Sequence, residues 1–140
     1  MSAVEILLGA LLAVPFVLFA RTRRAEDRFY AAGLVVAALA YVGFALAAGA
    51  GGGALLTELI GVVVFGAVAW LGVRRAPLWL AAGWAAHVGW DLLLHPLIGP
   101  AYAPAWYVRA CVGFDLGVAG WIALRPHPGA HPEAHPEDQP

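Results

Sequence analysis

The sequence predicts an all-α, polytopic membrane protein: a bundle of five transmembrane helices with its N-terminus outside and its C-terminus in the cytoplasm. Of its 140 residues, 62% are hydrophobic and 12% are charged, whereas soluble domains carry about 25% charged residues. The apolar residues form long runs, and five runs approach the roughly 20 residues that cross a bilayer. The cationic residues, all arginines, cluster beside the ends of these runs.

Each predicted span is bounded by residues that break or end a membrane helix. The spans cover residues of about 2–20, 29–49, 54–73, 78–95 and 104–124. RTRRAEDR follows the first, AAGAGGGA the second, and Arg74 and Arg75 the third. PLIGPAYAP separates the last two, because its three prolines and one glycine prevent a regular helix. Residues 126–140, rich in His-Pro pairs and acidic residues, are predicted to form a disordered cytoplasmic tail.

The arginines set the predicted orientation. Five spans place seven of the eight arginines on one side, and the positive-inside rule makes that side cytoplasmic. They are Arg21, Arg23, Arg24, Arg28, Arg74, Arg75 and Arg125. Four spans would split these arginines between both sides.

The first run is preceded by Glu5 and followed by arginines, unlike a signal peptide, so we expect it to be retained. The expected location is a bacterial inner, or plasma, membrane.

A polar stripe in the fourth span marks the candidate site. His87, Asp91 and His95 are spaced four residues apart and therefore lie near one helix face. Ionisable groups at this depth are costly and usually have a function or a partner. His87 and His95 are about 12 Å apart along the helix axis, so one metal ion would take Asp91 with one histidine and not both.

Carboxylates on other spans lie at similar depths. A rise of 1.5 Å per residue places Glu5 about 5 Å deep, Glu58 and Asp91 about 6 Å, His87 about 12 Å and Asp115 about 16 Å. This predicts one pocket that opens outward. Histidine and carboxylate ligands suit zinc, iron or manganese. The candidate ligands of such a divalent metal are His87, Asp91, Glu58, His95, Asp115 and Glu5.

Other interpretations of the same residues remain open. The pocket could be a metal-free catalytic or binding site, or part of a proton or ion path. Asp91 could simply pair with Arg109 or with a protonated histidine. Arg109 is rotated by roughly 160° from Cys111 on an ideal helix, which favours contact with lipid headgroups. Cys111, the single cysteine, is more typical of packing than of catalysis.

Two further features concern partners. Gly113 and Gly117 form a small-xxx-small pair, which favours close packing within the bundle or a homo-oligomer interface. The net charge of −1 provides no basic surface for nucleic acid. We therefore expect the lipid bilayer and a lipid-like small molecule as partners.

The last two spans resemble a known family. AAGWAAHVGWDLLLHP and PAWYVRACVGFDLGVAGWIAL are similar to an uncharacterised family, a domain of unknown function, of small bacterial integral membrane proteins. Its pattern is an HxxWD-type helix followed by a WY…C…D helix. The matching positions are His87, Trp90, Asp91, His95, Trp106, Tyr107, Cys111 and Asp115. The resemblance implies the fold and these signature positions but no activity, and Arg109 departs from it.

Together these patterns favour a metal-dependent membrane enzyme. Its substrate would be a lipid, an isoprenoid or a quinone-like molecule from the outer leaflet, and the metal would activate water or oxygen. The catalytic residues are not predicted. The alternative is a non-enzymatic membrane subunit, structural, transporting, proton-relaying or ligand-binding, whose buried polar network stabilises the bundle. The inner halves of the spans hold few polar residues, which argues against a channel formed by one chain.

Overall fold

The computed structural model describes residues 3–94, 97 and 102–126, and these residues form helices and no strand. The helices are α1 (Ala3–Arg21), α2 (Glu26–Ala47), α3 (Gly52–Arg74), α4 (Leu78–Gly89) and α6 (Ala105–Leu124). A π-helical turn, η1 (Trp90–Leu94), continues α4 directly. The all-helical prediction is confirmed, and each helical segment lies within a few residues of a predicted span. The predicted tail falls almost wholly outside the described residues.

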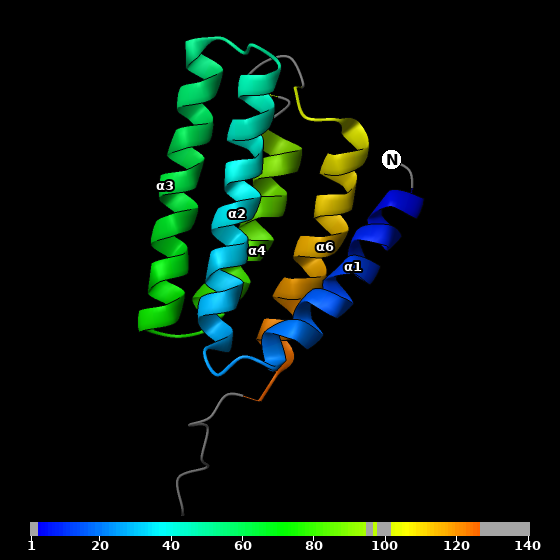
Figure 1. The fold of residues 1–140 in the computed structure, drawn as a ribbon, viewed down its shortest axis with the longest axis vertical. Helices are drawn as coiled ribbons and strands as arrows, with labels where there is room; N and C mark the ends of the chain where they lie inside the picture. The colour runs from blue at the N-terminus through cyan, green and yellow to red at the C-terminus, as the bar shows by residue number, and fades with distance from the viewer. Residues whose placement is uncertain (1–2, 95–96, 98–101, 127–140) are drawn as a thin grey trace, which may run out of the picture.

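Consecutive helices run in opposite directions, as Figure 1 shows. The α1–α2 and α3–α4 connections lie at one end of the bundle, and the α2–α3 turn lies at the other. Four helices, α1, α2, α3 and α6, are long and apolar enough to cross a membrane. In the α2–α3 turn, Gly49 has a φ of 63°, a left-handed conformation that a glycine adopts without steric cost.

The outward faces of the helices are apolar. Leu11, Val36 and Val63 are each more than 60% exposed, although a helix of a soluble bundle would present polar side chains there. These faces suit contact with hydrocarbon and agree with the composition that predicts a membrane protein.

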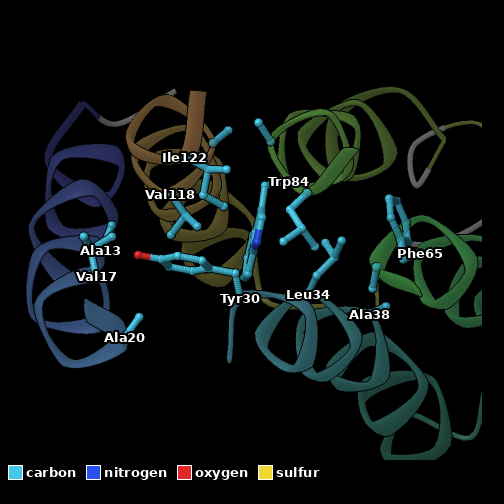
Figure 2. Packing of buried hydrophobic residues seen from close by; sticks show 14 residues of the cluster. Ala13, Val17, Ala20, Tyr30, Leu34, Ala38, Phe65, Trp84, Val118 and Ile122 are labelled. Atoms are coloured by element: carbon cyan, nitrogen blue, oxygen red, sulfur yellow. The ribbon is translucent and has the colours of Figure 1, made fainter. Parts of the chain in front are cut away.

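The core combines large and very small side chains. Trp84 of α4 packs among Tyr30 and Leu34 of α2 and Val118 and Ile122 of α6 (Figure 2). The contact between α1 and α6 is closer still, because glycines line it. A Cβ on Gly9 would lie 1.8 Å from the Ala110 carbonyl oxygen, and one on Gly113 would lie 1.8 Å from the Ile6 oxygen.

The glycine pair therefore packs inside one chain. A Cβ on Gly117 would lie 2.9 Å from the Ala13 side chain of α1, so Gly113 and Gly117 both face this helix. The sequence allowed two interpretations of this pair, close packing within the bundle or a homo-oligomer interface. In the structure the pair packs within one chain.

An ion-pair cluster joins α2 and α6 at the arginine end of the bundle. Arg125 pairs with Glu26 at 2.9 Å and also with Asp27. The Tyr30 hydroxyl donates a hydrogen bond to Glu26 at 2.9 Å, and the Arg125 guanidinium lies over the Tyr30 ring. Burial opposes the charge of Arg125, but the bonds to the two carboxylates raise its pKa above the usual value.

Candidate metal centre

Three buried side chains converge between α4, η1 and α6. The Nδ1 atom of His87 lies 2.8 Å from Oδ2 of Asp115 and 3.7 Å from Oδ1 of Asp91. One ligand atom from each residue can be chosen so that all three lie within 4.8 Å of one another. His87 is 0% exposed, Asp91 2% and Asp115 1%. We refer to these three residues as the His-Asp-Asp trio.

The helices position the trio through their aromatic contacts. His87 lies in the last turn of α4, and Asp91 lies in the π-helical turn that follows it. Such turns are rare and occur often at functional sites. On the next helix, Asp115 directly follows Phe114, whose ring packs 5.8 Å from that of Trp84, one turn before His87. This ring contact brings Asp115 opposite His87.

Aromatic rings surround the histidine. The rings of Tyr41 and Phe65 lie 5.7 Å and 4.9 Å from the imidazole, and Tyr41 also interacts with Asp91. The Nε2 atom of His87 is buried and has no hydrogen-bond partner among the described residues. The other nitrogen, Nδ1, is therefore the one that faces the two carboxylates.

The trio fits a divalent cation in charge and in geometry. Two ionised aspartates with a protonated histidine still carry a net charge of −1, and a buried net charge is costly. A divalent ion bound to a neutral imidazole would balance both carboxylates. Bonds of about 2.0–2.2 Å place tetrahedral ligand atoms roughly 3–4 Å apart. The separations of 2.8 Å and 3.7 Å are close to this range.

Glu58 lies beside the trio but bonds to other residues. It is 2% exposed, and it accepts hydrogen bonds from the Tyr102 hydroxyl and, at 3.4 Å, from Nε1 of Trp90. Burial and the neighbouring carboxylate raise the pKa of Tyr102, so its hydroxyl stays a donor at neutral pH. Trp90 directly precedes Asp91, so Glu58 holds the residue next to a member of the trio.

Of the two remaining candidates, Glu5 lies away from the trio. Glu5 of α1 pairs with Arg109 of α6 through two hydrogen bonds, one of them 3.1 Å long, and both side chains are partly exposed. Arg109 thus faces α1, whereas the sequence suggested lipid headgroups or Asp91 as its partners. The other, His95, lies outside the described residues.

Sequence reasoning missed Tyr102 as a partner of Glu58. Tyr102 lies in the PLIGPAYAP segment, which the prolines marked only as a loop. The one signal in the sequence is that this tyrosine lies in a loop at the outer end of the predicted carboxylate pocket. This position does not identify Glu58 as its partner.

A comparison with family models gives an independent result. Residues 1–127 match DUF6010, which is described as a family of unknown function. The chain belongs to this family. The DUF6010 match contains the whole His-Asp-Asp trio, and it confirms the resemblance drawn from the last two helices. No curated protein and no solved structure matches the chain.

Proposed function

We propose that this DUF6010 protein crosses a bacterial inner, or plasma, membrane five times, with its N-terminus outside and its C-terminus in the cytoplasm. Two observations support the proposal. The α4–η1 segment runs continuously from Leu78 to Leu94 alongside four helices of spanning length. Seven arginines lie in or beside α1–α2, α3–α4 and the end of α6, which are all at one end of the bundle (Figure 1).

Cysteine labelling tests this topology. In a Cys111→Ser background, Gly51→Cys reports on the α2–α3 turn and Ala76→Cys on the α3–α4 connection. A membrane-impermeant maleimide applied to intact cells should label the first variant, and should label the second only after lysis. The reverse pattern would contradict the orientation, and labelling of both positions in intact cells would contradict an odd number of crossings between them.

We further propose that the protein is a metal-dependent membrane enzyme that acts on a lipid, isoprenoid or quinone-like substrate. The observation that carries this proposal is the convergence of three fully buried ligand atoms within 4.8 Å. Zinc, iron or manganese suits these donors. Three protein ligands leave a coordination position open, as catalytic sites do, and the ion would activate water or oxygen there. Glu58, outside the trio, is the candidate general base.

Metal analysis of the detergent-purified protein tests the site. We expect about one equivalent of metal in the wild-type protein and almost none in Asp91→Asn or His87→Gln. Asp27→Asn is the matched control, because Asp27 pairs with Arg125 at the other end of the bundle, and it should retain the metal. A folded wild-type protein that binds no zinc, ferrous iron or manganese when each is supplied would refute the proposal.

One observation favours the second candidate, a non-enzymatic subunit stabilised by its polar network. The 2.8 Å bond between Nδ1 of His87 and Oδ2 of Asp115 pairs these two groups without a metal. In that case the wild-type protein would be metal-free, and Asp115→Asn would lower its stability. If the wild-type protein carries bound metal, stabilisation of the bundle is not the whole role of the trio.

A further inference from the structure

A cavity of about 390 Å³ lies beside the trio, between α1, α2 and α6. This volume falls within the 300–1,000 Å³ range of small-molecule sites. Its walls are mostly apolar and aromatic, including Phe16, Phe114 and Trp106. Asp115 also lines the cavity, so a ligand in this space would adjoin one member of the trio.

The cavity opens toward the lipid-facing surface. Leu12 of α1 and Val36 of α2 line it, and they are 61% and 65% exposed. Figure 1 shows α1 leaning away from α2 toward the end of the bundle opposite the arginines. A molecule dissolved in the bilayer could therefore enter between these two helices without passing through water.

One residue that lines the cavity carries a buried hydrogen-bond donor. Trp84 is 1% exposed and lines this space, and its Nε1 atom has no hydrogen-bond partner among the described residues. Leaving such a donor unsatisfied costs about 1–3 kcal/mol. Gly33, which also lines the cavity, lets the rings of Phe16 and Trp84 pack close to the α2 backbone, because a Cβ there would lie 2.8 Å from Cζ of Phe16 and 3.1 Å from Cζ2 of Trp84. A ligand oxygen in the cavity would satisfy the donor.

The charges of the cavity indicate a neutral ligand. None of the described residues that line it is cationic, and Asp115 is the one acidic residue among them. A phosphate or a free carboxylate would find no cationic side chain to pair with among these residues. A carbonyl oxygen carries no net charge and accepts a hydrogen bond from an indole.

We propose that this cavity binds a neutral lipid that combines a long apolar tail with a carbonyl oxygen, and that Trp84 donates a hydrogen bond to that oxygen. The ligand enters from the bilayer between α1 and α2, and its polar end adjoins Asp115. This inference rests on the proposed function, because it assigns the substrate site of the same metal centre. Both an acyl ester and a quinone carry such a carbonyl.

Photo-crosslinking in lipid nanodiscs tests the inference. Two diazirine-tailed probes, a diacylglycerol and an isoprenoid quinone, distinguish the two sources of the carbonyl. We expect one probe to label peptides of α1, α2 or α6, and the unlabelled form of that probe to compete. Trp84→Phe keeps the ring and removes the donor, so it should weaken this labelling about two- to tenfold.

An entrance variant keeps the test independent of core packing. Val36→Trp should abolish competable labelling, because the new indole fills the opening at an exposed position. The matched control is Leu39→Trp, since Leu39 is also exposed on α2 and does not line the cavity. Two results would overturn the inference. One is labelling that excess unlabelled probe fails to displace, and the other is unchanged labelling in the Val36→Trp variant.

The two proposals can fail separately. Asp91 belongs to the trio and does not line the cavity, so Asp91→Asn should lose the metal and keep the lipid labelling. Metal bound to a wild-type protein that neither probe labels would overturn the inference alone. Competable labelling of a wild-type protein that binds no metal would overturn the metal proposal and uphold the lipid site.

Discussion

Replacement of Gly113 by alanine tests the contact between α1 and α6. The added Cβ would lie 1.8 Å from the Ile6 carbonyl oxygen, while real contacts of this kind are not shorter than about 3.0 Å. Raising this distance from 1.8 to 3.0 Å requires the helices to separate by about 1.2 Å. Overpacking of this size costs about 1–3 kcal/mol, so Gly113→Ala should lower the free energy of unfolding by that amount.

The assay is unfolding by sodium dodecyl sulfate in mixed micelles, followed by tryptophan fluorescence and circular dichroism. Gly120→Ala is the control, because a Cβ there meets nothing within 4 Å, and alanine favours a helix by about 0.5–1 kcal/mol over glycine. The control should therefore be as stable as the wild-type protein or slightly more stable. Equal stabilities of Gly113→Ala and Gly120→Ala would refute the close helix contact.

Three further predictions concern the charged groups. Arg109→Gln breaks a partly exposed pair with Glu5, so it should lower stability in the same assay by no more than about 1 kcal/mol and leave the metal content unchanged; metal loss would place Arg109 in the site. Glu58→Gln should keep the metal but weaken its affinity about 10–100-fold in titration against a chelator, and an unchanged affinity would contradict its supporting role. Protons compete with a metal for His87 and the carboxylates, so the bound metal measured after dialysis should fall as the pH is lowered from about 7.5 to about 5; retention of all metal at the lower pH would argue against a histidine ligand.

Much of the fold and part of the candidate site follow from local patterns. Runs of about 20 apolar residues locate the helices, because a helix of this length and composition can cross a bilayer. His87 and Asp91 share a face because they are four residues apart. Asp115 could be matched to them by depth, since antiparallel helices of similar length place equal depths side by side.

The remaining contacts depend on helix rotation and on local departures from the α-helix, which the sequence does not specify. The rotation of Arg109 away from the Cys111 face follows from helix geometry, but its partner Glu5 is 104 residues away. The π-helical turn at Trp90–Leu94 has no sequence signature. It rotates Trp90 and the following residues relative to an ideal helix, and Trp90 hydrogen-bonds to Glu58.

The packing of α1 on α6 also constrains the order in which the bundle assembles. α1 meets α6 at Gly9 and Ala110, but α2, α3 and α4 lie between these two helices in the chain, so α6 is synthesised well after α1. Contacts between such distant segments form slowly, because a long loop must close before they can stabilise anything. The first helix is therefore made well before the helix on which it packs. A chain truncated before α6 would leave the surface of α1 around Gly9 without the helix that covers it, so this contact forms only after the other helices have been made.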